Sequence, residues 1–230
     1  MKVGGILVSS RKIVHMFFKT LFIGGIVGFL TSIFVHFDQY MTYIQPFNAL
    51  ELLGVVLFYI GYALVFTVVA QTGFFAYLFI HRFGIGFFKS FWPMVQLLLI
   101  LLALFDMIYF SSNQIPLWFK IVLAAFVLVT AIIVAKMKVK RTNQSAFVPS
   151  MFVMIVITAL EFSLVLRAGN IPFVIIMVIT VLTATAYQLL ILHKVTEVDE
   201  EHQKRIQARR KARLEQQKMK QANKESHSKK

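Results

Sequence analysis

Long apolar stretches separated by short polar connections fill the first 193 residues of the sequence. Because a helix rises about 1.5 Å per residue, about 20 apolar residues cross a hydrocarbon layer about 30 Å thick. Six stretches reach this length, and each predicts a transmembrane helix: residues 14–35, 50–80, 91–110, 117–135, 147–166 and 171–192. The pattern therefore predicts an all-α, polytopic integral membrane helical bundle over residues 1–193, followed by a polar tail over residues 194–230.

The prolines support this division of the chain. A proline in the first turn of a helix loses no hydrogen bond, whereas a proline in the middle removes one that lipid cannot replace. Each of the five prolines stands near the start of one of the second to sixth expected helices: Pro46, Pro93, Pro116, Pro149 and Pro172. The second stretch is longer than one crossing requires, so we expect a tilt or a break there, with residues 71–73 as the break point.

Basic residues gather on one predicted side of the membrane. The first twelve residues, the connections after the second and fourth helices and the tail hold twenty-one Lys and Arg, whereas only Lys120 and Arg167 stand at the opposite helix ends. Basic residues near helix ends mark the cytoplasmic side, so both termini are expected in the cytoplasm. The first apolar stretch is long and no small-residue cleavage pattern follows it, so we expect it to remain as an anchor.

The composition agrees with a membrane protein and narrows its chemistry. Hydrophobic residues make up 58% of the 230 residues and charged residues only 15%, with a mean hydropathy of +0.75. A soluble core of this size could not bury so much apolar surface. The sequence has no cysteine, which excludes disulfides, thiolate metal sites and cysteine nucleophiles. Metalloprotease and nucleophile-elbow patterns are missing too, so we expect no catalytic, cofactor-binding or metal-binding residues and no enzymatic activity.

The tail from residue 194 onward is strongly basic. It carries twelve Lys or Arg against six Asp or Glu, and the pairs Glu200–Lys204 and Glu201–Arg205 favour a helix at its start. We expect the last ten residues to be disordered. A basic segment next to a membrane is attracted to anionic lipid by about 1 kcal/mol per charge, so we expect lipid anchoring by this cytoplasmic tail, with a protein partner as the alternative and no nucleic acid.

Small side chains form one face of the first expected helix. Thr20, Gly24, Gly28 and Ser32 recur every four residues, a spacing that lets another helix backbone approach closely. This face predicts helix packing. The partner helix belongs either to the same bundle or to another protein chain.

Acidic and basic residues near the predicted outer surface form a second group. Asp106 and Glu161 each lie about fifteen residues into a helix that enters from the cytoplasm, which places them near its outer end. Glu51, Lys120 and Arg167 are expected at the same level. These five residues predict a polar ring that could form a ligand pocket. Alternatively, they reach the interface or pair with each other.

The second connection, residues 81–90, combines two glycines with basic and aromatic residues. Phe88 occupies the position where a Walker loop has glycine before its lysine, so a nucleotide loop is not indicated. We expect Gly84 and Gly86 to permit a tight interfacial turn with phenylalanines among lipid headgroups. A docking loop for a partner, including His81 and Arg82, is the alternative.

Several segments between residues 46 and 106 resemble a known family. The residues that carry the resemblance are Pro46-Phe47-Asn48, Glu51-Leu52-Leu53-Gly54, Gln71-Thr72-Gly73-Phe74-Phe75-Ala76-Tyr77-Leu78, His81-Arg82-Phe83-Gly84, Phe91-Trp92, Gln96 and Phe105-Asp106. They are similar to the KinB-signalling pathway activation protein family, called KbaA, of spore-forming bacteria. The long basic tail departs from the shorter pattern of that family.

This resemblance implies a protein of the bacterial cell membrane that is needed for the activity of a membrane-bound sensor histidine kinase. That kinase feeds the phosphorelay that starts sporulation. No catalytic residues come with the family, so the implied role is a non-enzymatic accessory protein that favours the competent kinase state. The residues expected to contact the kinase are Gly24, Gly28, His81, Arg82, Gly84 and Gly86.

The alternative function is a small membrane transporter or channel component that uses Asp106 and Glu161. Transporter sites typically lie near the bilayer midplane. The expected position of both carboxylates near the outer surface therefore disfavours this alternative.

Overall fold

A computed structural model of the chain describes residues 10–109, 115–166 and 170–196, together with positions 208, 209, 212, 215 and 216. The chain divides into two compact units. One comprises Val14–Leu192, and the other comprises Met1–Ile13 with His193–Lys230. The described residues of the latter unit are helical.

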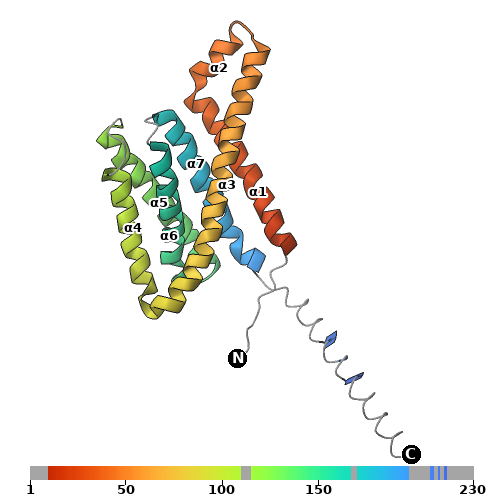
Figure 1. The fold of residues 1–230 in the computed structure, drawn as a ribbon, viewed down its shortest axis with the longest axis vertical. Coiled ribbons are helices and arrows are strands. Elements are labelled where there is room, and N and C mark those ends of the chain that lie inside the picture. Colours follow the sequence, from red (N-terminus) through yellow and green to blue (C-terminus); the bar gives the residue numbers. More distant parts are fainter. Residues whose placement is uncertain are drawn as a thin grey trace, which may run out of the picture. The chain divides into compact units, whose positions relative to one another are not determined.

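Helices account for every element in the described part of the chain, which contains no strand (Figure 1). The elements in order are α1 (Ser10–Val35), α2 (Phe37–Ile44), α3 (Ala49–Phe88), the short 3-10 helix η1 (Lys89–Phe91), α4 (Trp92–Tyr109), α5 (Leu117–Arg141), the 3-10 helix η2 (Gln144–Ala146), α6 (Phe147–Leu166) and α7 (Ile171–Thr196). The all-α prediction is confirmed.

Five helical stretches of the described residues are long and apolar enough to cross a membrane. The longest, Ala49–Tyr109, contains both α3 and α4, which gives six helices when the two are counted separately. An all-helical chain with five to six helices of spanning length and composition is therefore confirmed, and it is compatible with the predicted membrane bundle. The prolines stand where the sequence predicted, since Pro116 immediately precedes α5 and Pro172 is the second residue of α7.

The predicted break at residues 71–73 is wrong, because α3 runs through them without interruption. The Thr72 hydroxyl donates to the Val68 carbonyl at 3.0 Å, one turn earlier in the same helix. A Cβ atom on Gly73 would lie 3.1 Å from the Ile157 side chain of α6. Gly73 therefore allows a close approach of two helices, and glycine in that role does not end a helix.

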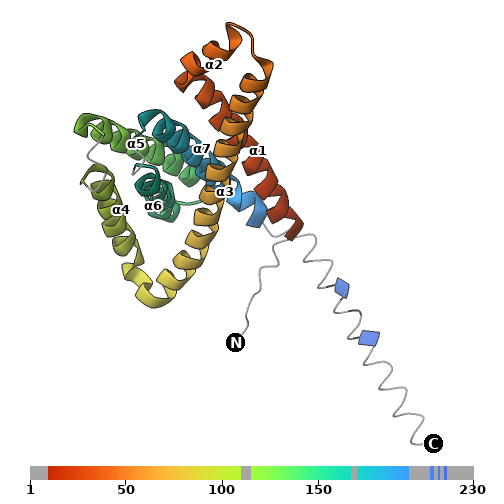
Figure 2. The same cartoon turned by 45° about the horizontal axis from the view of Figure 1, so that its top comes forward.

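The predicted turn at Gly84 and Gly86 is also wrong, since both residues lie inside α3. The chain reverses after them, at Lys89, which has a positive φ of 50°. Figures 1 and 2 show α3 and α4 meeting in this corner, at the end of α3 that is remote from α2. The helix thus continues about two turns beyond the apolar run that predicted it.

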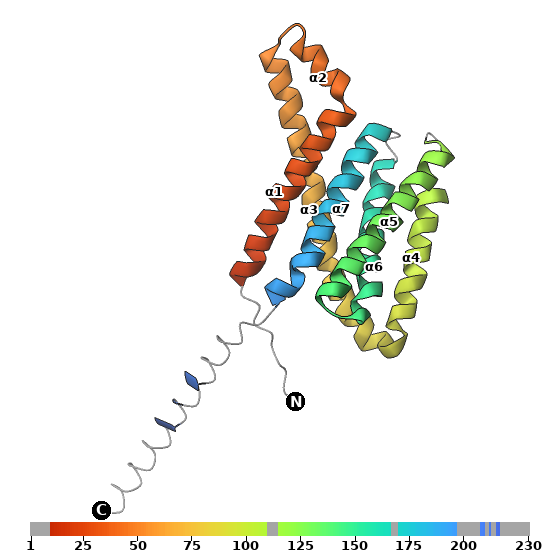
Figure 3. The same ribbon diagram turned by 180° about the vertical axis from the view of Figure 1, so that it is seen from behind.

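The short helix α2 connects α1 to α3 and was not predicted from the sequence (Figure 3). Its Tyr40 is buried, and the Tyr40 hydroxyl and Ser32 Oγ of α1 lie 3.0 Å apart in a hydrogen bond. Tyr40 also lies against Tyr59 of α3, with ring centroids 5.8 Å apart. The connection before α3 is therefore folded back onto the bundle.

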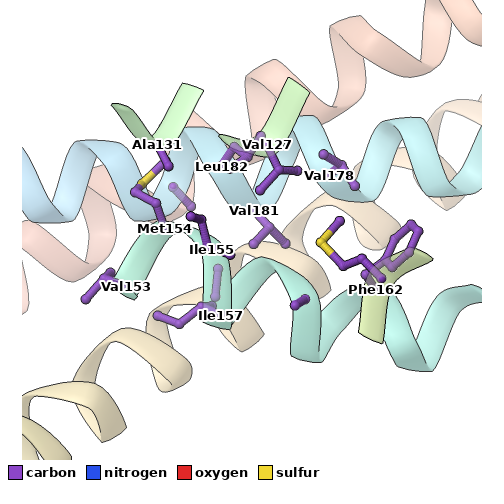
Figure 4. Close-up of a cluster of buried hydrophobic side chains, with 14 of the residues drawn as sticks. Val127, Ala131, Val153, Met154, Ile155, Ile157, Phe162, Val178, Val181 and Leu182 are labelled. Atoms are coloured by element: carbon purple, nitrogen blue, oxygen red, sulfur yellow. The ribbon is translucent and has the colours of Figure 1, made fainter. Parts of the chain in front are cut away.

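The core of the Val14–Leu192 unit is centred on α6, which contacts α3, α4 and α5. Figure 4 shows apolar side chains of α5, α6 and α7 meeting there, among them the fully buried Val127, Val153, Ile155 and Val181. By contrast, leucines cover an open face of α4: Leu97, Leu98, Leu101 and Leu102. An apolar exposed face of this kind is compatible with contact to lipid.

Candidate functional site

An aromatic corner joins the end of α3 to the start of α4. Trp92 Nε1 donates a hydrogen bond to His81 Nδ1 at 3.0 Å, so the proton of the neutral His81 ring must reside on Nε2. Gln96 Nε2 lies 3.5 Å from the same Nδ1 atom. The ring of Tyr77 lies 5.4 Å from that of His81, and Phe152 of α6 packs on Tyr77 at 5.6 Å. These contacts fix the angle at which α4 leaves α3.

Gly84 is the residue that lets this corner close. It is buried, and a Cβ atom built on it would overlap the indole ring of Trp92. Phe88 stacks on Trp92, with ring centroids 5.8 Å apart and an interplanar angle of 19°. Only a residue without a side chain allows α3 to touch the indole so closely.

The opposite face of the same turns of α3 is open. Phe83 is 77% exposed and Phe87 is 83% exposed, and Arg82 and Gly86 are exposed beside them. We call these four residues the corner rim. The sequence grouped His81, Arg82, Gly84 and Gly86 as one contact surface, but the structure separates them. His81 and Gly84 face inward to Trp92, whereas Arg82 and Gly86 face outward.

The small face of α1 packs within the chain itself. A Cβ atom on Gly24 would overlap Thr67 of α3, and one on Gly28 would lie 2.6 Å from the Cβ of Ala63 and 2.5 Å from Thr180 Oγ1 of α7. Both glycines are buried. The structure therefore favours the alternative in which this face contacts helices of its own bundle, and it leaves no open surface at Gly24 or Gly28 for a kinase.

A pocket of about 550 Å³ lies at the other end of α3 from the corner. We call it the α2–α3 pocket. Its lining includes His36, Gln39, Glu51, Phe58, Tyr59 and Phe173. They come from the α1–α2 junction, from α2, from the first turns of α3 and from the start of α7. The Tyr62 hydroxyl donates to the Phe173 carbonyl at 3.3 Å just below the pocket and ties α3 to α7.

The predicted outer polar ring is distributed over several helices. Glu51 lines the α2–α3 pocket, whose lining includes none of the other predicted members. Lys120 of α5 and Glu161 of α6 are buried on two helices that contact each other, and Asp106 lies near the end of α4. Arg167 lies outside the described residues. A single ring of all five residues stays a prediction.

Sequence reasoning did not identify His36, Tyr59 or Phe173 as site residues, because they come together from segments far apart in the chain. For the aromatic corner, by contrast, the sequence contains a pattern that indicates one buried helix face. Gln71, Phe74, Tyr77, His81 and Gly84 follow each other at intervals of three or four residues, which is the spacing of one helix face. Extending the second helix past residue 80 would have placed that face against Trp92.

Among the described residues, no group of three or more His, Asp or Glu side chains could hold a metal ion. Lipid anchoring was predicted for the tail over residues 194–230, of which the structure describes residues 194–196, within α7, and five further positions, all helical. Disorder was predicted for the last ten residues, which lie outside the described residues. Those two expectations stay predictions.

Comparison with known proteins gives one family match and one curated relative. The family model described as KinB-signalling pathway activation in sporulation, KbaA, matches residues 24–195. The chain belongs to the KbaA family. A KbaA relative from Bacillus subtilis (strain 168), the KinB-signaling pathway activation protein, is 32% identical over 193 residues, which cover 81% of this chain and 98% of the relative. No solved structure matches.

The family expected from the sequence is thus confirmed. The KbaA match includes both the aromatic corner and the α2–α3 pocket. It ends at residue 195 and does not cover the tail beyond that residue. The residues that carry the resemblance build the corner from inside. His81, Gly84, Trp92 and Gln96 lie together there, so in this chain these residues form a packed joint between two helices.

His36 at the pocket provides a pH-dependent property that can be measured. Its ring lies 4.9 Å from Tyr59 and 5.2 Å from Phe173, and burial lowers the pKa of His36 below its ordinary value of 6.5. As the pH falls below that value, the unfolded chain binds a proton before the folded chain does, so the folded state loses stability. Tyr40 and Tyr59 are uncharged near neutral pH, so they do not change this loss of stability. The negative charge of the Glu51 carboxylate favours a protonated His36 and therefore reduces the loss.

We expect the melting temperature of the wild-type protein to fall between about pH 7 and about pH 5, and to fall less in His36→Gln. Thermal unfolding in detergent at a series of pH values measures this difference. His15→Gln is the matched control, because His15 is exposed on α1, and it should follow the wild type. Equal pH dependence in His36→Gln and the wild type would contradict the burial of His36.

Proposed function

We propose that this protein is a non-enzymatic accessory protein of the bacterial cell membrane that activates a KinB-type sensor histidine kinase on the route to sporulation. The observation that carries the proposal is membership of the KbaA family over residues 24–195. The apolar bundle supports a location in the membrane, where such a kinase also resides. The positions of Lys and Arg support termini in the cytoplasm.

The proposed mechanism is differential contact with two states of the kinase. An accessory protein shifts such an equilibrium only by as much as it binds one state better than the other. A preference of about 1.4 kcal/mol for the competent state changes the ratio of the two states tenfold. This mechanism needs neither a nucleotide site nor a catalytic residue in the accessory protein.

The corner rim is the surface that we propose for this contact. It combines a cation with large exposed aromatic side chains, and residues of this kind dominate the binding energy of protein interfaces. The packed joint between His81, Gly84 and Trp92 holds the rim in place from behind. By the distribution of basic residues, the rim faces the cytoplasm, where the catalytic part of a sensor kinase acts.

Replacing the cation and one of the two phenylalanines of the rim should therefore weaken kinase binding. We expect Arg82→Glu combined with Phe87→Ala to reduce the amount of KinB-type kinase that co-purifies by about tenfold or more. The readout is the ratio of the two tagged proteins after purification from the membrane, with kinase autophosphorylation followed in parallel.

Phe34→Ala is the matched control for this experiment. Phe34 and Phe87 are both 83% exposed, but Phe34 lies at the end of α1 next to α2, far from the corner. The control should leave co-purification and protein abundance unchanged. Full co-purification of the double variant would exclude the corner rim as the contact surface.

A further inference from the structure

The α2–α3 pocket has aromatic walls. The Tyr59 and Phe173 rings are stacked with centroids 6.1 Å apart, and Phe58 meets Phe173 edge-on at 6.2 Å. The His36 ring lies against both Tyr59 and Phe173. The faces of such rings carry negative electrostatic potential and attract a cation within about 6 Å of the ring centroid.

The polar atoms of the pocket include hydrogen-bond acceptors beside the amide groups of Gln39 and Asn170. The Tyr59 hydroxyl donates its proton to Gln39 Oε1 at 2.8 Å and thereby holds Gln39 at the pocket. His36 Nε2 is buried and has no hydrogen-bond partner among the described residues. A neutral histidine with its proton on Nδ1 accepts a hydrogen bond at Nε2.

The charge of the pocket also favours a cation. Among the described residues that line the pocket, Glu51 is the only Asp, Glu, Lys or Arg. This carboxylate disfavours an anionic ligand. A metal ion is disfavoured as well, because His36 and Glu51 alone do not form a group of three or more metal-binding side chains.

We propose that the α2–α3 pocket binds an organic ammonium group, which rests against Phe58 and Phe173 with Glu51 as its counter-ion. Phe58 is 56% exposed, whereas the Tyr59 ring is only 1% exposed and lies beneath the site. Aromatic walls with one carboxylate recognise substituted ammonium ions in this way. The ammonium group belongs either to a free amine in solution or to the headgroup of an amine-bearing lipid. Binding at this pocket does not depend on the proposed contact with a kinase.

The test compares choline with 3,3-dimethylbutan-1-ol, which has the same shape but no charge. The full-length protein is placed in nanodiscs of phosphatidylglycerol, which has no amine, and binding is measured by equilibrium titration. We expect the dissociation constant for choline to be about tenfold lower than that for the neutral alcohol. Equal affinities for the two compounds would overturn the proposal. So would the absence of choline binding at concentrations up to about 100 mM.

Two variants assign the binding to this pocket. Glu51→Gln should weaken choline binding about tenfold and leave the neutral alcohol unaffected, because it removes charge from an exposed side chain without changing its size. Asp38→Asn is the matched control, since Asp38 is an exposed carboxylate on the nearby α2 that does not line the pocket. Choline affinity that is unchanged in Glu51→Gln, or equally reduced in Asp38→Asn, would refute the assignment to Glu51.

A third arm of the test distinguishes the two sources of the ammonium group. Nanodiscs that contain phosphatidylethanolamine present an amine headgroup at the level of the membrane surface. Weaker apparent choline binding in those discs would identify the lipid headgroup as the occupant, whereas unchanged binding would identify a free amine. Either result supports the ammonium site, and neither bears on kinase activation.

Discussion

Replacing Gly84 with alanine is expected to destabilise the protein by about 1–3 kcal/mol, although alanine favours helices over glycine by about 1 kcal/mol. The added methyl group would overlap the indole ring of Trp92, which is only 4% exposed. The indole must then move, and its hydrogen bond to His81 is strained or lost. The sign of the effect is therefore opposite to that of intrinsic helix propensity.

Thermal unfolding in detergent measures this prediction, and the fluorescence of Trp92 should shift to longer wavelength as the ring becomes more exposed. Gly86→Ala is the matched control two residues away. No atom lies within 4 Å of a Cβ built on Gly86, so alanine there should be neutral or stabilise by up to about 1 kcal/mol. If both variants gain stability, the packed joint at Trp92 does not exist as described.

Leucine in place of Gly28 should cost more, about 3 kcal/mol or above. The side chain would have to enter a space in which even a Cβ atom lies 2.6 Å from Ala63 on α3 and 2.5 Å from Thr180 on α7. Relief requires α1 to move away from two helices at once. We expect a lower melting temperature and a lower yield of folded protein from the membrane.

Gly61→Leu is the control for Gly28→Leu. Gly61 lies on the exposed side of α3, with no atom within 4 Å of its Cβ position, so a leucine there should leave stability within about 0.5 kcal/mol of the wild type. A small effect at both glycines would mean that the small face of α1 is not closely packed against its own bundle.

The sequence predicted the positions of the long helices well because membrane crossing imposes a simple requirement of about 20 apolar residues. Proline at the start of α5 and α7 confirmed those boundaries. The same requirement explains the error at α3. A length rule ends the helix near residue 80, but Phe74, Tyr77 and Gly84 are buried on one continuous face, and packing against Trp92 extends the helix further.

The α2–α3 pocket could not be predicted in the same way. His36 and Phe173 are separated by more than half of the chain and meet only because α1 and α7 both pack against α3. No local pattern encodes such a meeting. Glu51 was recognised as a site residue from its charge alone, yet its neighbours in the pocket are aromatic rings and not the other predicted charges.

The 40 residues of α3 form a single helix, which corresponds to about 60 Å and thus to twice the thickness of a hydrocarbon layer. At tilts of up to about 40°, the range that membrane helices show, α3 is too long to fit within one such layer. Glu51 and Phe87 stand at opposite ends of α3, so at most one of them lies inside the hydrocarbon of a membrane that the helix crosses.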